Sequence, residues 1–553
     1  MEQLTCLKKL IHRIKIISGI VLLSTLSAQS QQPVYNYFYR VTFTDKGSIN
    51  LSTINPATLL SQRALSRRSK AGVPAPDILD IPVRKQYIDS VIARGYTLHC
   101  TSRWMNTALF KSIAELDPSA LLDLPFVASA RIVKKPAGKK ITADKFLLNV
   151  SSYFQPPYDN PVTMIKGNLL HDSGYDGTGV LVAVLDAGFY NADIISSVAS
   201  LRDRNGIIAT HDFVTLGTDV YSYHNHGTEV LSVLSGLTPG EISGSAPGAD
   251  YCLFRTEDAS SEYPVEEDFW AAGAELADSI GADIISSSLG YFNFDDSSMN
   301  YSYSAMNGHT TFVTRAAEAA ASKGILVVNS AGNERITAWQ RIIAPSDGEN
   351  VLAVGAVDGT MKISSFSSAG PSADGRVKPD ISAQGVSVPV QFMESTFARA
   401  NGTSFSCPLI SGMCACLIQA FPKATAPDII SALQHSADRF NDPDSLYGYG
   451  IPDVNKAALL LLSEYPPSPD REFLCYPNPV NGKFSIWFAE PPGSIELNVY
   501  NISGMLVLKR SYPDFTEKVL ENEDLANLGQ GLYILKIKTS GRIFSAKLSL
   551  IKD

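Results

Sequence analysis

The middle of the chain alternates apolar runs with amphipathic stretches. Apolar or β-branched residues fill three runs that contain or border glycine, at 179–189, 281–291 and 324–334. The stretches 268–280 and 310–324 instead repeat their apolar residues at helical spacing. Continuous apolar runs are typical of strands covered on both faces, and helices between such strands indicate a parallel sheet. We therefore predict an α/β domain, a parallel sheet flanked by helices, over residues 146–463.

The segment before this domain has the pattern of a small α+β unit. We expect strands at 37–43, 96–110 and 126–133, and helices at 83–95 and from Asp117 onward. A polar and basic stretch follows at 134–146, and exposed stretches of this composition are preferred sites of proteolysis. We predict one domain over residues 31–145 with a cleavage site near its end.

The C-terminal part is separated by a proline-rich break. Residues 464–473 contain three prolines and are predicted to be a linker. Beyond them, apolar and polar residues alternate in five segments between turn signals: 482–488, 494–504, 504–510, 531–541 and 543–552. This period of two predicts a small antiparallel β-sandwich over residues 474–553.

Residues 1–30 have the pattern of a signal peptide. Four basic residues, at positions 8, 9, 13 and 15, precede an apolar stretch at 16–28 that ends in small residues. That stretch is too short to be a stable membrane span, although an N-terminal anchor is the alternative interpretation. We expect export and removal of residues 1–30.

Length, composition and charge then narrow the class of protein. The chain has 553 residues, 45% of them hydrophobic and 18% charged, which indicates several globular domains. Residues 31–150 hold 17 Lys and Arg against 8 Asp and Glu, and residues 1–30 hold four against one. With a formal charge of −9 overall, the remainder carries −21. An acidic body disfavours binding to nucleic acid, and it should attract the basic segment before it.

The sequence gives little indication of a metal site or of disulfides. The eight histidines form no HExxH motif and no Cys/His pair at zinc spacing. The acidic pairs Glu266–Glu267 and Asp295–Asp296 are predicted to be solvated surface. The seven cysteines form no dense framework, so we expect buried thiols in place of disulfides.

The sequence around Ser404 is compatible with two roles for this serine. It lies in "NGTSFSCP", behind an Asn-Gly-Thr turn and ahead of an apolar helix, where a serine is either an N-cap or a nucleophile. A serine hydroxyl attacks only if a base takes its proton, and a carboxylate best orients that base. Asp186 in "VAVLDAGF" and His226 in "NHGTEV" are the candidates. Asn333 in "NSAGNE" and the backbone N–H of Ser404 could stabilise an oxyanion.

At this point the residues resemble the subtilisin-like serine peptidases, known as subtilases. Asp186, His226, Asn333 and Ser404 match the family's Asp, His, oxyanion and Ser motifs in the family's chain order. The resemblance covers about 300 residues. Three positions depart from the family. Ala187 replaces the usual Ser or Thr, Glu229 stands where a second His is common, and Cys407, before Pro408, is a small apolar substitution. His224 has no motif support and is interpreted as a loop residue.

The resemblance implies a function and a substrate cleft. The function is peptide-bond hydrolysis through an acyl-enzyme, in a secreted serine endopeptidase that acts on polypeptides and requires no cofactor. The stretch "SSSLGY" at 286–291 would be the strand along which an extended substrate adds by backbone pairing. The cleft would be lined by Ser288, Leu289, Gly290, Ala331 and Gly332. The family often binds structural calcium, but the sequence places no metal site.

The two flanking domains resemble parts of such precursors. The basic N-terminal domain looks like an inhibitory propeptide that assists folding, blocks the cleft and is removed by self-cleavage near residues 136–155. "YPNP" at 476–479 and the closing 547–552 are similar to the C-terminal sorting domain of the type IX secretion system of Bacteroidetes. This implies contact with that machinery, then release or attachment at the outer-membrane surface. We expect a monomer.

One alternative belongs to a different class. The protein could be a catalytically silent, surface-displayed binding protein that keeps the fold. Such a protein would be expected to lose at least one of Asp186, His226, Asn333 and Ser404. All four are present, so the sequence favours the enzyme.

Overall fold

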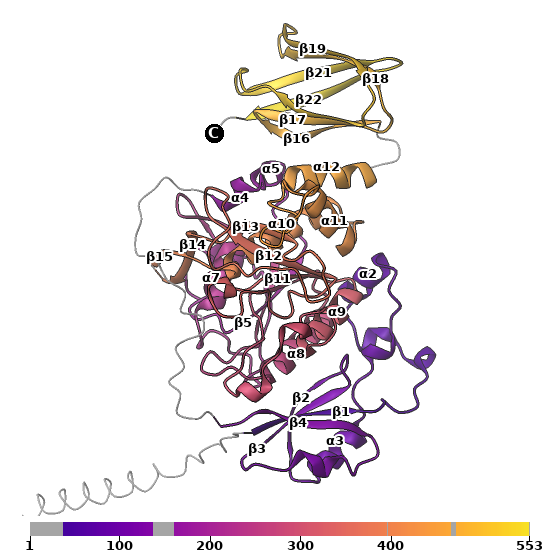
Figure 1. The fold of residues 1–553 in the computed structure, drawn as a ribbon. Helices are drawn as coiled ribbons and strands as arrows, with labels where there is room; N and C mark the ends of the chain where they lie inside the picture. The colour runs from indigo at the N-terminus through magenta and orange to yellow at the C-terminus, as the bar shows by residue number, and fades with distance from the viewer. Residues whose placement is uncertain (1–36, 137–159, 395, 466–471, 552–553) are drawn as a thin grey trace, which may run out of the picture.

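A computed structural model of the chain describes residues 37–136, 160–394, 396–465 and 472–551. They form an N-terminal domain, a central domain and a C-terminal domain, with the first and last at opposite ends of the central one (Figure 1). The predicted signal peptide, most of the predicted linker and nearly all of the predicted cleavage segment lie outside the described residues.

The N-terminal domain is the predicted α+β unit. Its antiparallel sheet has the order β2-β3-β1-β4, built from β1 (Tyr37–Phe43), β2 (Thr97–Ser102), β3 (Thr107–Ser112) and β4 (Val127–Lys134). Helix α3 (Lys85–Ile92) packs on it with Val91 in the core. The helix expected from Asp117 is only a 3-10 turn, η4 (Pro118–Leu121), because Pro125 disfavours helical backbone in the residue before it. Helix α2 (Gln62–Lys70) was not predicted.

The central domain has the predicted parallel sheet. Seven strands lie in the order β13-β12-β11-β10-β5-β9-β6, and all neighbours are parallel. Their bounds are β5 (Leu181–Asp186), β6 (Ile207–Asp212), β9 (Asp250–Arg255), β10 (Ile284–Ser287), β11 (Leu326–Ser330), β12 (Val351–Val357) and β13 (Ile381–Gln384). The order changes direction around β5, so the crevice at the carboxyl ends of these strands is where function is expected.

Helices cover both faces of this sheet. Side chains alternate along β5: Val182 and Val184 face a core shared with α7 (His226–Ser235) and α10 (Thr403–Ala420). Leu181 and Leu185 face a second core shared with α8 (Val265–Ile280) and α9 (Phe312–Ser322). Among the described helices, α10 has the length and hydropathy of a membrane span, yet 83% of that window is buried in the protein.

Shorter elements complete the central domain. They are α4 (Pro161–Met164), α5 (Asn168–Asp172), α6 (Ala199–Asp203), α11 (Ala426–Ser436), α12 (Val454–Glu464), β7 (Leu237–Thr238), β8 (Ile242–Ser243), β14 (Val388–Met393) and β15 (Thr396–Ala400). The six described cysteines form no disulfide, and five of them are buried. Burial raises the pKa of the Cys407 thiol to about 12, so this thiol stays protonated near neutral pH.

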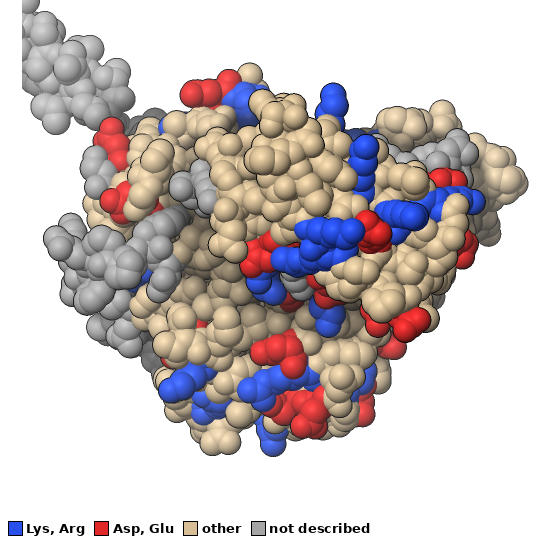
Figure 2. All heavy atoms as spheres, turned by 90° about the horizontal axis from the view of Figure 1, so that it is seen from above, with Lys and Arg blue, Asp and Glu red and all other residues tan. Residues whose placement is uncertain are grey.

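The C-terminal domain is built from strands. Its seven strands are β16 (Phe473–Asn481), β17 (Lys483–Phe488), β18 (Gly493–Asn501), β19 (Leu506–Phe515), β20 (Val519–Asp524), β21 (Gly531–Thr539) and β22 (Ile543–Ile551). Two of these, β16 and β20, were not predicted, and β16 pairs in parallel with β22. Tyr476 and Trp487 join the core of the central domain near α5 and α12. Seen from this end, acidic and basic side chains are interspersed (Figure 2).

An acidic face of α8 meets the basic N-terminal domain. Four carboxylates form this face: Glu267, Asp268, Glu275 and Asp278. Arg68 bonds to Asp278 at 2.6 Å, and Arg103 lies 3.3 Å from the same carboxylate. The prediction that Glu266 and Glu267 are solvated is wrong, because both side chains are fully buried. Opposite charges and backbone N–H groups stabilise them there, since an unpaired buried carboxylate is costly.

Candidate active site

The four candidate catalytic residues lie at the carboxyl edge of the parallel sheet. Asp186 ends β5, and Asn333 lies in the turn after β11. His226 opens α7, and Ser404 lies in the first turn of α10. Four segments that are far apart in the sequence therefore bring their polar side chains to one edge, as expected for an open α/β sheet.

Asp186 and His226 form a buried pair. Oδ1 of Asp186 lies 2.7 Å from Nδ1 of His226, and the two side chains are 0% and 2% exposed. The same oxygen accepts the N–H of Ala187 at 2.7 Å, which holds the carboxylate in place. Gly227 permits this approach, because a methyl group on it would lie 2.5 Å from the carbonyl oxygen of Gly188. The pair can therefore fix the ring orientation of His226.

Ser404 contacts the segment that follows β10. Its backbone carbonyl accepts a hydrogen bond from Oγ of Ser288 at 2.9 Å, and its own Oγ lies 3.5 Å from the carbonyl of Ser288. The ring of His226 lies beside Phe405, the next residue of α10, with centroids 6.1 Å apart. The hydrogen bond between a nucleophilic serine and its base is often long in unliganded enzymes and tightens when substrate binds.

Asn333 is oriented by the residue before Ser404. Its Oδ1 accepts the N–H of Thr403 at 2.9 Å and the Oγ1 hydroxyl of Thr403 at 3.1 Å. Because a backbone N–H can only donate, these contacts identify Oδ1 and leave Nδ2 available as a donor. This role of Thr403 was not predicted, although the residue lies in the same stretch, "NGTSFSCP", as Ser404.

The five predicted cleft residues lie on two adjacent segments. Ser288, Leu289 and Gly290 follow β10, and Ala331 and Gly332 follow β11, which pairs with β10 in parallel. The side-chain amide of the strand residue Asn329 donates to the carbonyl of Leu289 at 3.0 Å and so ties the two segments together. Ala331 is fully buried and can offer a ligand only its backbone.

Glu229 and His224 make hydrogen bonds at the start of α7, where His226 lies. Oε1 of Glu229 accepts the side-chain amide of Asn225 at 2.8 Å. His224 is a loop residue, as predicted, and its Nδ1 accepts the N–H of His226 at 3.1 Å. With Glu229 at this position, the Asp186–His226 pair is still formed.

One acidic group in the described part of the chain has the spacing of cation ligands. Carboxylate oxygens of Glu257, Glu262 and Glu266 lie within 4.8 Å of one another. The oxygens of Glu266, however, accept the backbone N–H groups of Asp258 and Tyr263 at 2.9 and 3.2 Å. We therefore assign no calcium site to this group.

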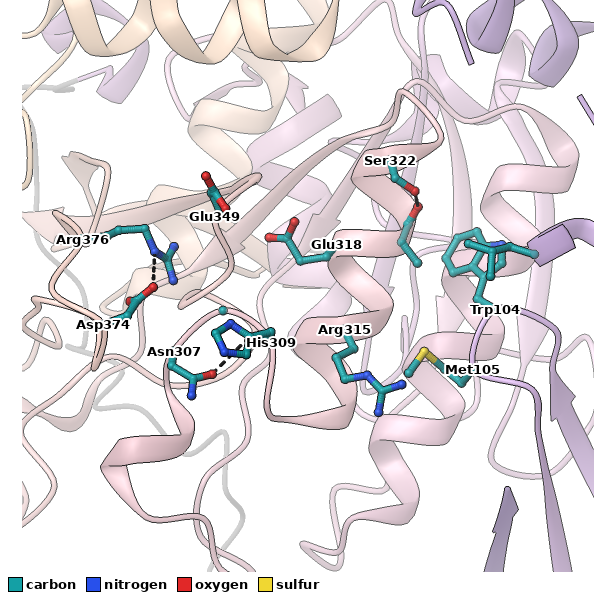
Figure 3. A pocket seen from close by; sticks show the side chains of 13 residues that line it. Trp104, Met105, Asn307, His309, Arg315, Glu318, Ser322, Glu349, Asp374 and Arg376 are labelled. Atoms are coloured by element: carbon teal, nitrogen blue, oxygen red, sulfur yellow. Dashed lines mark hydrogen bonds and ion pairs between the residues drawn. The ribbon is translucent and has the colours of Figure 1, made fainter. Parts of the chain in front are cut away.

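A cavity of about 490 Å³ lies away from the candidate site, at the border of two domains. Trp104 and Met105 of the N-terminal domain line one side, and Arg315 and Glu318 of α9 line another (Figure 3). None of the four candidate catalytic residues lines it. The cavity takes its present shape only while the N-terminal domain is in place.

Three parts of the chain each match a known protein family. Residues 177–450 match the subtilase family of S8 peptidases. Residues 38–145 match the S8 propeptide domain of Bacteroidota, and residues 474–552 match the secretion-system C-terminal sorting domain.

Individual relatives match the central domain. The chain is 28% identical to subtilisin DY of Bacillus licheniformis over 305 residues, which are 55% of this chain and 98% of subtilisin DY. It is 30% identical to subtilisin E of Bacillus subtilis over 303 residues, 54% of this chain and 70% of the relative. It is also 30% identical to M-protease of Shouchella clausii over 297 residues, 54% and 68% of the two chains. The chain therefore belongs to the subtilase family: it is a serine-type endopeptidase with a Bacteroidota propeptide domain and a sorting domain, secreted or displayed at the cell surface.

Proposed function

We propose that Ser404, His226 and Asp186 form the catalytic triad of this endopeptidase. The observation that supports the proposal best is the buried 2.7 Å pair of Asp186 and His226 beside the first turn of α10, which holds Ser404. Oγ of Ser404 attacks the peptide carbonyl carbon while Nε2 of His226 takes its proton. His226 gives that proton to the leaving amine, and an acyl ester on Ser404 remains.

The second half of the reaction uses the same groups. His226 takes a proton from water, the resulting hydroxide attacks the ester, and the proton returns to Oγ of Ser404 as the acid leaves. Asp186 orients His226 and stabilises its charged form. In both halves the oxyanion accepts hydrogen bonds from Nδ2 of Asn333 and the backbone N–H of Ser404, the latter at the N-terminus of α10.

The N-terminal domain is proposed to inhibit the enzyme until it is cut away. Its last strand, β4, ends at Lys134, whose Nζ lies 2.8 Å from Asp258 and 2.9 Å from the hydroxyl of Ser261. Both partners follow β9 at the carboxyl edge of the sheet, the edge that holds Asp186. The chain therefore leaves the N-terminal domain beside the candidate site, which supports self-cleavage near residues 136–155.

The proposed domain boundaries are those predicted from the sequence. They are a signal peptide at 1–30, the propeptide domain at 31–145, the catalytic domain at 146–463, a linker at 464–473 and the sorting domain at 474–553. We further propose that the enzyme acts as a monomer on polypeptides and that its sorting domain is read by the type IX secretion machinery.

The test compares three forms of residues 31–553: wild type, Ser404→Ala and the control Ser406→Ala. Ser406 lies in the same helix, and its hydroxyl donates to the carbonyl of Thr403 at 3.1 Å. Intact mass should show loss of about the first 110 to 125 residues in the wild type and the control, while Ser404→Ala stays whole. Loss of a nucleophile costs on the order of a millionfold in turnover. If a folded, processed wild type does not react with a serine-directed phosphonate, the silent binding protein becomes the better interpretation.

A further inference from the structure

The side chain of Ile343 fills the space between the two walls of the candidate cleft. A methyl group placed on Gly290 would lie 2.2 Å from Cδ1 of Ile343, and one placed on Gly332 would lie 2.9 Å from the same atom. Carbon atoms in van der Waals contact are about 3.5–4.0 Å apart, so one isoleucine packs directly on both glycines. The two walls therefore have no open gap between them at this point.

This contact lies next to the proposed nucleophile. Gly290 is two residues beyond Ser288, which exchanges contacts with Ser404 through both its hydroxyl and its carbonyl. On the other wall, Gly332 donates its N–H to Oγ1 of Thr403 at 3.2 Å. The segments that hold Gly290 and Gly332 thus flank Ser404, and Ile343 lies between them.

Ile343 is held firmly in this position. Ile343 is only 7% exposed. Its carbonyl accepts both the N–H of Ser346 at 2.9 Å and the hydroxyl of Ser346 at 2.6 Å. The next residue, Ala344, accepts the N–H of Tyr291, which follows Gly290 directly, at 2.8 Å. Residue 343 is therefore tied to the wall it touches, and moving it away would break contacts with both segments.

We propose that Ile343 limits the substrate residue on the acyl side of the cut bond, called P1, to small side chains such as Gly, Ala and Ser. The inference rests on the proposed function, because it requires an acyl group on Ser404. Because the two walls flank Ser404, the P1 side chain of an acyl group on Ser404 would enter the space between them and meet Ile343. A side chain much longer than Cβ then overlaps Ile343, and overpacking of this kind is costly. Two glycines facing each other would leave a deep pocket if residue 343 were small.

The experiment measures kcat/KM of the processed enzyme on the p-nitroanilides of succinyl-Ala-Ala-Pro-Xaa, where Xaa is Ala, Leu or Phe. The wild type should prefer Ala over Phe by at least about 10-fold, and Ile343→Ala should raise the Phe/Ala ratio by about 10-fold or more. Ile343→Val should change the ratio less, in the same direction, and serves if Ile343→Ala does not process. Ile342→Val is the matched control, because Ile342 is fully buried and meets neither glycine.

The outcomes separate the inference from the proposed function. A wild type that prefers Phe or Leu would overturn the inference, as would a Phe/Ala ratio that Ile343→Ala and Ile342→Val leave equally unchanged. Titration of each variant with a serine-directed phosphonate counts active sites and removes differences in folding yield. If no form reacts with the phosphonate or cleaves any peptide, the proposed function itself fails, and the inference fails with it.

Discussion

We predict that His99 makes binding of the propeptide domain sensitive to pH. It lies on β2, between the rings of Phe38 and Phe269. The centroid of the His99 ring is 5.3 Å from the centroid of each of these rings. Its Nε2 donates to the carbonyl of Phe213 in the central domain at 2.8 Å, and its buried Nδ1 has no acceptor in the described part of the chain. The ring is therefore neutral while the two domains are bound, since a proton on Nδ1 would be buried without a partner.

The size of the effect follows from the pKa. Burial lowers the pKa of His99 to about 4 in the complex, against about 6.5 for an exposed histidine. The released domain then binds a proton that the complex rejects, so binding is strongest above pH 6.5 and weakens as the pH falls toward 4. At pH 5 this amounts to about 30-fold in the inhibition constant, and the loss levels off below pH 4.

The assay adds the separate propeptide domain to processed enzyme and measures the inhibition constant from pH 8 to pH 5. His99→Gln keeps an N–H donor for Phe213 and removes the titrating group, so its inhibition constant should rise at least 10-fold less than that of the wild type. Burial also raises the pKa of Glu275 on the acidic face of α8, and this shift strengthens binding as the pH falls. Both propeptide domains, wild type and His99→Gln, contact the same Glu275, so comparing them cancels this contribution. Equal pH profiles for wild type and His99→Gln would refute the reasoning.

Two further predictions concern single contacts. Arg40 is 3% exposed and donates to both oxygens of Asp268, at 2.8 and 2.6 Å, so Arg40→Ala should weaken inhibition by about 3–5 kcal/mol, a few hundred- to a few thousand-fold. Lys85→Ala, which removes an exposed pair with Asp89, is the control and should change inhibition by less than about threefold; a similar value for both variants would contradict the prediction. Asn333→Ala should lower kcat about 100- to 1,000-fold with KM nearly unchanged, as stopped-time assays on one peptide can show, and a loss confined to KM would argue against an oxyanion role.

Local patterns were sufficient for the parallel sheet and for the candidate site residues. The strands ending at Asp186 and Ser287 lie in runs of mostly apolar residues, and such runs predict buried strands from the sequence alone. The motifs around His226 and Ser404 are short and contiguous, so each could be found without knowing the fold. The 2.7 Å pairing of Asp186 with His226, in contrast, depends on how two distant segments pack.

Charged residues that are buried against other charges could not be predicted from local patterns. Helix α2 was missed because its inward face carries Arg67 and Arg68. Both are buried against the distant Asp278, and Arg68 also pairs with Asp80. Glu267 was assigned to the surface for the same reason. Ile343 gave no signal either, because an isoleucine beside a proline-containing turn looks like any core residue until its contact with Gly290 is known.

The two flanking domains contact different parts of the catalytic domain. The N-terminal domain covers α8 at one end, and the C-terminal domain rests on α5 and α12 at the other (Figure 1). Separated contacts contribute additively to stability, so losing one domain leaves the hold on the other unchanged. If the N-terminal domain is removed as proposed, the surface of α5 and α12 that carries the sorting domain therefore stays intact, and the enzyme can be activated before or after sorting.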